Sequence, residues 1–440
     1  RWGRDCGASR VSPFPALTLQ VLPATAIAVA LGVFATPCAA QVSGLPSFGI
    51  QPPQITPGVD EKQIALDVTG AYDSNVARSD AALAAARGVT PQDFYIVPGG
   101  DFTFSHSFGR ETIYLDGSAG YKAYDKNTFL NRSSIELGGG GVSQISICQS
   151  TAAGAYSRSQ ADLSYLPVVV QNGQPAAIAK DTLTNATVNF TATCGRTIGL
   201  APTMSVSEVW VTNDNTSLAA IDAHVFNGSG GVTYRSPVFG SVTINGQYSK
   251  TTYPNRFVPF EGGSTSLGYQ TTGGGITLAR AVGSRLSGTL SVDYTNLEPG
   301  NGVTQGFSGI TYNGDITYAV NPRLNVAVVA GREVAPSNEI EASFTLTEIY
   351  GVQASYGAGN RLSFAAGWSH VHALYEGLLV PVVLFNLTDQ TTNSVYGNAT
   401  YRLNRWLSVT PSVTYSQRTA NVVAYSYTDV VCAVTLRSSF

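Results

Sequence analysis

The sequence predicts an all-β protein: a single transmembrane antiparallel β-barrel of about 18 strands, with short periplasmic turns and longer extracellular loops. Three observations support this class. Apolar and polar residues alternate along most of the chain, short arginine-bearing turns recur, and the last strand ends in an aromatic residue. Charged residues make up 12% of the 440 residues, about half the ~25% usual in soluble domains. Apolar residues make up 43% and the net charge is −3, which argues against disorder and against a nucleic-acid partner.

The N-terminal segment has the pattern of a secretory signal peptide. Three arginines precede an apolar stretch from Ala16 to Ala35, and small residues stand just before an expected cleavage site after Ala40. A membrane anchor is the alternative interpretation of the same stretch. Four prolines follow in the next twenty residues, so we expect an extended lead-in there rather than a strand. The expected organisation is a signal peptide at 1–40, a periplasmic lead-in at 41–62 and an outer-membrane barrel at 63–440.

Alternation with a period of two is clearest at residues 286–295. Leu290 and Val292 fall on one face, and Ser291 and Asp293 fall on the other, the pattern of a strand with one apolar and one polar face. Such segments run ~10–15 residues, longer than the ~5–6 of globular sheets and sufficient for a tilted membrane strand. The eighteen candidate strands lie near 63–73, 93–106, 111–124, 131–143, 146–158, 182–193, 199–212, 222–235, 238–251, 264–280, 285–297, 306–320, 324–335, 346–357, 361–374, 392–403, 406–419 and 425–440. Sixteen strands is the alternative count.

The turns between these segments alternate between short and long. The short turns carry Arg110, Arg196, Arg235, Arg285, Arg323, Arg361 and Arg405. Only the first gap in that series is about twice the others, so we expect one turn without an arginine, near residues 144–146. The expected long loops are Ser74–Gln92, Ala161–Asp181, Pro254–Gly262, Pro299–Thr304, Pro336–Phe344 and Glu376–Thr391. Aromatic residues near strand ends, such as Trp368 and Trp406, fit interfacial girdles.

The final strand supports closure in a membrane. Lipid offers no partner for backbone N–H and C=O groups, so a membrane sheet must close on itself. Val434 and Leu436 alternate with polar residues, and the chain ends at Phe440. A terminal aromatic residue on such a strand is similar to the signal that the barrel-insertion machinery recognises. We therefore expect Phe440 to be the barrel-assembly signal, with that machinery and outer-membrane lipid as partners.

The first strands carry a family resemblance. Tyr72-Asp73-Ser74-Asn75 ends the first strand, and Phe94-Tyr95-Ile96-Val97-Pro98 and Gly120-Tyr121-Lys122-Ala123-Tyr124 follow. This succession resembles the β-barrel porin type 2 family of proteobacterial outer membranes, over about residues 63–440. The resemblance implies a barrel in the bacterial outer membrane. It also implies a link to exopolysaccharide or capsule loci, which neither composition nor spacing indicates.

The sequence favours a passive or weakly selective porin-like channel for small hydrophilic solutes. The candidate pore-lining residues, assigned by strand parity, are Asp67, Asp101, Asp116, Lys122, Asp293, Asp315 and Arg402. Acidic residues exceed basic ones in this set, which would favour cations or neutral solutes. The alternative is that these are ordinary solvated lumen residues. Two other functions stay open: a barrel that helps export or anchor surface polysaccharide, with Tyr95, Tyr114 and Tyr124 stacking on sugars, and a structural or adhesive surface protein. The sequence indicates neither the solute nor the oligomeric state.

The sequence offers little support for catalysis or a cofactor. His370 and His372 share a strand face, but no third metal ligand is visible. Ser105 and His106 suggest a hydrolase, yet they lie beside a short turn. We therefore expect no enzyme, cofactor or metal site. The apolar loop segments Leu166–Val170 and Leu378–Phe385 are expected to fold inward or to contact a partner.

Three cysteines follow the expected signal peptide. Cys148 begins one strand and Cys194 ends a neighbouring one, both near the periplasmic rim. A disulfide between them and two free thiols both stay open, because a bond requires close Cα atoms and a shared face. Cys432 has the parity of Val434, so we expect it to face lipid unpaired.

Overall fold

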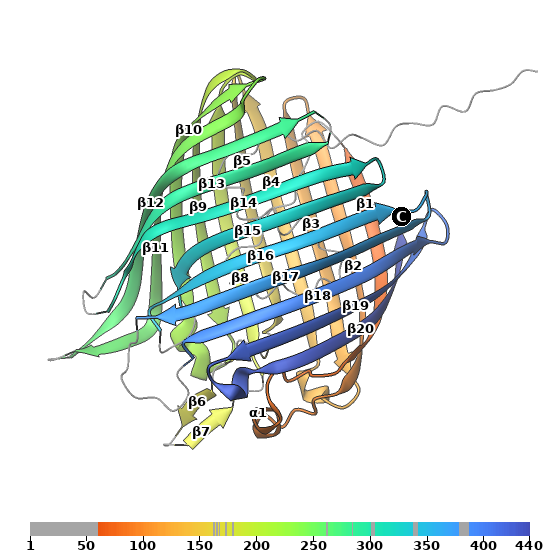
Figure 1. The fold of residues 1–440 in the computed structure, drawn as a ribbon, viewed down its shortest axis with the longest axis vertical. Helices are drawn as coiled ribbons and strands as arrows, with labels where there is room; N and C mark the ends of the chain where they lie inside the picture. Colours follow the sequence, from red (N-terminus) through yellow and green to blue (C-terminus); the bar gives the residue numbers. More distant parts are fainter. Residues whose placement is uncertain are drawn as a thin grey trace, which may run out of the picture.

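The computed structural model describes residues 60–161, 163, 166, 168–171, 174–177, 180–260, 263–283, 285–300, 304–337, 342–377 and 387–440. Within these residues, eighteen strands form one antiparallel sheet, and the last strand pairs with the first (Figure 1). They are β1 (Glu61–Asp73), β2 (Asp93–Phe108), β3 (Glu111–Tyr124), β4 (Arg132–Ile145), β5 (Cys148–Gln160), β8 (Thr182–Cys194), β9 (Gly199–Asn213), β10 (Ala223–Ser236), β11 (Gly240–Phe260), β12 (Gly263–Val282), β13 (Leu286–Pro299), β14 (Phe307–Asn321), β15 (Leu324–Pro336), β16 (Phe344–Gly357), β17 (Leu362–Glu376), β18 (Asp389–Arg402), β19 (Leu407–Ala420) and β20 (Tyr427–Ser439). The predicted eighteen-stranded closed barrel is confirmed.

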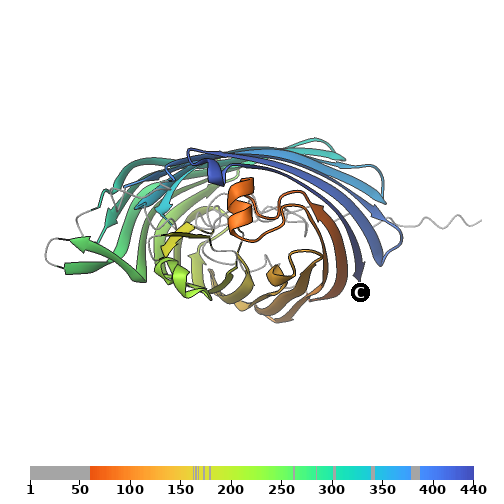
Figure 2. The same ribbon diagram turned by 90° about the horizontal axis from the view of Figure 1, so that it is seen from below.

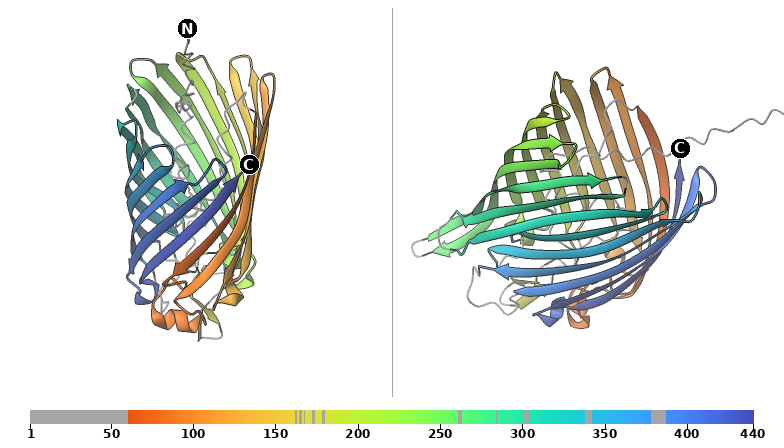
Figure 3. Two further views of the ribbon diagram at one scale, coloured as in Figure 1. Left: turned by 90° about the vertical axis from the view of Figure 1, so that its right-hand side faces the viewer. Right: turned by 45° about the horizontal axis from the view of Figure 1, so that its top comes forward.

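The two ends of the barrel differ. Short turns join β2 to β3, β4 to β5 and the later pairs at one end, where the C-terminus also lies (Figure 3). The turn after β4 has no arginine and places Ser146 at a positive φ of 58°. The longer connections gather at the other end, together with α1 (Ala81–Ala86) and the hairpin β6 (Val168–Gln171) and β7 (Gln174–Ala177). Short turns face the periplasm in barrels of this kind, so the loop end is extracellular.

The alternation of apolar and polar residues in the sequence corresponds to the outer and inner faces of the barrel wall. In β1, Ile64 and Leu66 are more than half exposed, whereas the intervening Ala65 is fully buried and Thr69 is 7% exposed. The apolar face is therefore the outer, lipid-facing surface, and the interior holds mostly small and polar side chains. None of the described helices is both long and apolar enough to span a membrane.

Three parts of the loop end depart from the sequence prediction. The predicted loop Pro254–Gly262 is wrong over its first seven residues, because β11 runs on to Phe260. The pairing of β11 with β12 shifts register between Thr252 and Phe257, and such a bulge accommodates Pro254, which cannot donate to the ladder. Helix α1 and the β6–β7 hairpin were not predicted. The expected signal peptide and most of the lead-in lie outside the described residues.

Candidate functional site: the barrel lumen and its mouth

The interior face is lined by hydroxyl side chains that pair across strands. The hydroxyl oxygens of Thr69 and Thr435 lie 2.8 Å apart across the β1–β20 seam, and those of Thr233 and Thr243 also lie 2.8 Å apart. Each pair satisfies two buried polar groups without a charge. These parts of the interior are therefore polar without carrying a charge, which suits a water-filled lumen.

Four acidic residues, which we call the acidic arc, share the interior face of β1–β4. They are Asp67, Asp101, Asp116 and Glu136. Asp67 has the parity of buried Thr69, and the cross-strand pairs place the others on the same face. Arg437 of β20 holds Asp101 through two contacts, with nitrogen–oxygen distances of 2.6 and 2.8 Å, and stands opposite Asp67 in the register. These four carboxylates and the one guanidinium together carry a formal charge of −3.

The opposite wall carries two further predicted residues. Asp293 of β13 accepts a hydrogen bond from Asn245 at 3.5 Å, and Asp315 of β14 accepts one from the Thr289 hydroxyl. Both have interior parity, because the outward positions of these strands hold exposed apolar side chains such as Val292. The structure thus places acidic groups on two sides of the lumen.

The two predicted basic residues lie in different places. The Lys122 ammonium sits 3.8 Å from the ring centroid of Tyr95 and 4.8 Å from that of Tyr124, so it lies on the extracellular side of the acidic arc. Arg402 is the last residue of β18 and is exposed at the periplasmic rim. Sequence reasoning missed Glu136 and Arg437 as interior residues. Arg437 follows from parity, because it alternates with outward Leu436, whereas the glycines after Glu136 hide the alternation of β4.

Glycines on the interior face let neighbouring side chains lie flat. A Cβ atom on Gly138 would come within 2.7 Å of Oδ1 of Asp116, and one on Gly140 within 2.7 Å of the Tyr114 hydroxyl. These side chains therefore cross the adjacent strand instead of projecting toward the barrel axis. Tyr114 is consequently only 5% exposed, and its predicted availability for stacking on sugars is wrong. The run of glycines in β4 thus widens the lumen.

Helix α1 lies within the outline of the barrel at its extracellular end (Figure 2). Ala84 packs in an apolar cluster with Leu166 and Leu218, which come from the loops after β5 and β9. Leu83, the next residue back, packs in a second cluster with Tyr375 of β17 and Tyr425 of the β19–β20 connection. The helix therefore bridges two sides of the mouth and narrows it. Leu166 folds inward as expected, whereas Leu378–Phe385 lies outside the described residues.

Polar side chains hold α1 in this position. Asp80 caps the helix by accepting from the Leu83 amide at 2.7 Å, and its own amide donates to the Ala424 carbonyl at 3.1 Å. Arg87, which is 4% exposed, donates to the carbonyls of Ala77 and Leu166 at 3.1 and 2.7 Å. An N-cap aspartate, an alanine-rich run and a glycine after the last turn are the sequence signals that could have revealed the helix.

A second buried arginine fixes another loop, the connection from β15 to β16, at the extracellular mouth. Arg256 of β11 is 3% exposed and donates to the carbonyls of Ser337 and Ala342 at 2.8 and 2.9 Å. These two residues flank the connection from β15 to β16, which is not adjacent to β11 in the sheet. This contact therefore ties distant parts of the extracellular mouth together.

The residues considered for catalysis or metal binding point elsewhere. Ser105 is buried on the interior face, while His106 packs edge-on against Phe108 on the outer face and contacts Asp60 at 3.0 Å. The two side chains cannot act together. His370 lies between Tyr350 and Trp368 on the outer surface, and the described residues hold no group of three metal-type ligands.

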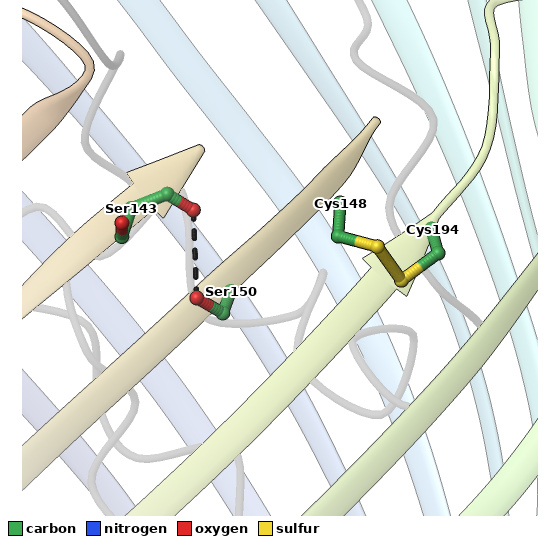
Figure 4. The surroundings of a disulfide bond; sticks show 4 residues. All are labelled: Ser143, Cys148, Ser150 and Cys194. Atoms are coloured by element: carbon green, nitrogen blue, oxygen red, sulfur yellow. Dashed lines mark hydrogen bonds between the residues drawn. A yellow bond between two sulfur atoms is a disulfide. The ribbon is translucent and has the colours of Figure 1, made fainter. Parts of the chain in front are cut away.

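At the periplasmic rim, a terminal backbone contact and a disulfide each join two neighbouring strands. Phe440 exchanges backbone hydrogen bonds with Ile64 at 2.8 and 3.3 Å, extending the β1–β20 seam. Cys148 and Cys194 are direct cross-strand partners, their Cα atoms are 3.9 Å apart, and they form a disulfide (Figure 4). Cys432 is free and exposed on the outer surface, as its parity indicated.

A closed barrel with an apolar exterior and a polar interior defines a transmembrane barrel protein of the outer-membrane class. The family model described as putative beta-barrel porin 2 matches residues 63–440. The chain belongs to this family, and it is a porin-like barrel of the bacterial outer membrane. Comparison with curated proteins finds no match.

Solved barrels of Pseudomonas aeruginosa are similar at low identity. OpdK with vanillate is 10% identical, with a TM-score of 0.45, 86% of this chain covered and 99% of that one. The siderophore receptor PirA is 10% identical, with a TM-score of 0.44 and coverage of 88% and 81%. OccK2 (OpdF) in complex with glucuronate is 10% identical, with a TM-score of 0.46 and coverage of 88% and 100%.

Proposed function

We propose that this barrel is a passive, weakly selective diffusion channel that favours cations and small neutral solutes over anions. The acidic arc carries the proposal: Asp67, Asp101, Asp116 and Glu136 share the interior face, and the guanidinium of Arg437 pairs with Asp101. Rings of carboxylates lower the energy of cations in a pore and raise that of anions. Small hydrophilic solutes are the expected cargo, and both the family and the fold fit a channel better than an enzyme.

In this proposal α1 forms the constriction. Leu83 and Ala84 connect apolar clusters on two sides of the mouth, so a solute must pass beside the helix before it reaches the acidic arc. Selection by size then occurs at the mouth, and selection by charge occurs deeper in the barrel.

Passage of a polysaccharide is the second candidate. The observation that favours it is the pair of interior tyrosines, Tyr95 and Tyr124, whose ring centroids lie 5.4 Å apart beside Lys122. Aromatic faces of this kind stack on sugar rings. Added oligosaccharide should then block the current of the refolded protein, and Tyr95→Ala should relieve that block.

Ion selectivity tests the leading proposal. Reversal potentials should be measured in a KCl gradient for the unchanged protein and for the double variant Asp67→Asn/Asp116→Asn. The double variant should lose most of the cation preference, because two of the four arc carboxylates are neutralised. Asp125→Asn/Glu298→Gln is the matched control, since both residues are exposed near the loop end. Equal reversal potentials in all three proteins would remove the acidic arc from the proposal.

A further inference from the structure

The periplasmic end of β8–β19 carries unbalanced positive charge. We call six of the exposed arginines there the arginine rim: Arg196, Arg280, Arg285, Arg323, Arg361 and Arg405. The turns that connect these strands, at 195–198, 237–239, 283–285, 322–323, 358–361 and 403–406, contain no aspartate or glutamate. Among the described residues, no carboxylate lies within ion-pair distance of any of the six. We propose that the arginine rim binds the phosphodiester headgroups of anionic phospholipids in the inner leaflet of the outer membrane.

The arginines stand where the headgroups of that leaflet lie. Tyr356 and Tyr401 are exposed on the outer face and pair with the first residues of β15 and β17, and outward aromatic residues mark the bilayer interface. Arg405 lies with its guanidinium carbon 4.6 Å from the ring centroid of Trp406, at the same height. A guanidinium presents a planar fork of donors that fits two phosphate oxygens. The rim is therefore adjacent to phosphate and not to acyl chains.

Several other cations of the barrel have an acidic partner. Near the extracellular end, Arg158 pairs with Asp214 at 2.8 Å, and Arg332 pairs with Glu348 at 3.6 Å. At the periplasmic end of β1 and β2, Asp60 supplies a negative charge, and a hydrogen bond from the Ser107 amide keeps its pKa below the usual value. In the described part of the chain, the exposed arginines of the arginine rim thus have no acidic partner within ion-pair distance. Their positive charge is spread along an arc of turns that follows the membrane surface, and this arrangement fits many lipid headgroups better than one acidic protein.

Lipid selectivity of the refolded full chain tests this assignment. The protein is reconstituted in phosphatidylcholine vesicles that contain a trace of spin-labelled phosphatidylglycerol or spin-labelled phosphatidylcholine, and the motionally restricted fraction of each label is measured. At low salt the restricted phosphatidylglycerol should exceed phosphatidylcholine by about threefold. The preference should fall by at least half in Arg285→Gln/Arg323→Gln/Arg361→Gln. It should be unchanged in the control Lys126→Gln/Lys180→Gln/Lys250→Gln, which removes three positive charges near the loop end.

Salt provides a measurement that does not depend on the variants. Raising the ionic strength from about 0.05 to 0.5 M shortens the screening length several-fold, so the preference of the unchanged protein should largely disappear. Equal restriction of both lipids at low salt would overturn the proposal and leave an acidic protein as the partner to seek. The proposal would also be overturned if the triple arginine variant kept its preference for phosphatidylglycerol. That variant must still be a folded barrel, as shown by migration on a denaturing gel that changes on heating.

Discussion

Arg437 illustrates how single interior side chains set the charge of the lumen. Its guanidinium holds Asp101 and stands opposite Asp67, so it organises two of the four carboxylates of the acidic arc. The alternation of β20 could have placed it inside, since Leu436 beside it is outward and exposed. What parity cannot reveal is the partner, because the β1–β20 register is set by closure of the whole sheet.

Lys122 should affect selectivity and not folding. Its ammonium faces the lumen between Tyr95 and Tyr124, so Lys122→Leu removes an interior positive charge and should increase the preference for cations. Barrel assembly should persist, because an interior position does not contact lipid; at mid-membrane on the lipid face a lysine would cost ~2–4 kcal/mol. The reversal potential measures the change in ion selectivity, and gel migration that changes on heating measures barrel assembly. A variant that no longer assembles would show that the assigned face of β3 is wrong.

Gly140 should be sensitive to the smallest side chain. A Cβ there would meet the backbone of β5, with the Cα of Ala153 2.9 Å away, and the Tyr114 hydroxyl at 2.7 Å. Overpacking of this kind costs ~1–3 kcal/mol, so Gly140→Ala should lower the urea midpoint of unfolding. Gly397→Ala is the matched control, because nothing lies within 4 Å of its Cβ position. Equal midpoints for the two variants would contradict the close packing of β4 on β5.

At the scale of the elements, strand boundaries were predictable because a membrane imposes them. Each barrel strand must cross the same apolar thickness, so alternation and turn residues locate its ends. β11 is the exception: Pro254 looks like the start of a loop, yet the bulge between Thr252 and Phe257 absorbs it. α1 escaped prediction for the opposite reason. It is too short to show a helical period, and its place in the mouth depends on contacts with loops distant in sequence.

Loosening α1 should widen the mouth. Leu83 is 6% exposed and packs against Tyr375 and Tyr425, so Leu83→Asp should detach one side of the helix and increase single-channel conductance. Ala85→Asp introduces the same charge on the exposed side of the same helix and should change conductance little. If both variants conduct like the unchanged protein, α1 is not the constriction.

The disulfide should be present in the periplasmic rim of the folded protein. Cys148 and Cys194 are bonded and Cys432 is free, so the mature chain, denatured without reductant, should react with one equivalent of a thiol reagent, at Cys432. Reduction should expose two more thiols and lower stability by ~2–4 kcal/mol. Three reactive thiols before reduction would rule the bond out. The sequence left this bond open, because the pairing of the two cysteines depends on the register of β5 and β8.

At the scale of the whole molecule, closure and the polar interior follow from the sequence, whereas the state of the mouth does not. Strand parity accounts for the interior positions of six of the seven predicted pore-lining residues, whereas Arg402 lies at the periplasmic rim, and the proposed role of the six in selectivity rests on that placement. Which loops enter the lumen depends on buried contacts such as Arg87 to Leu166 and Arg256 to Ser337. These join residues 79 and 81 positions apart, and no local pattern encodes them.

Current through single refolded molecules in a planar bilayer tests the central claim most directly. A water-filled lumen with an acidic wall should give discrete conductance steps, and a KCl gradient should give a reversal potential of the sign expected for cation preference. Protein that inserts and retains heat-modifiable migration but gives no steps would contradict the account, because the lumen would then be sealed.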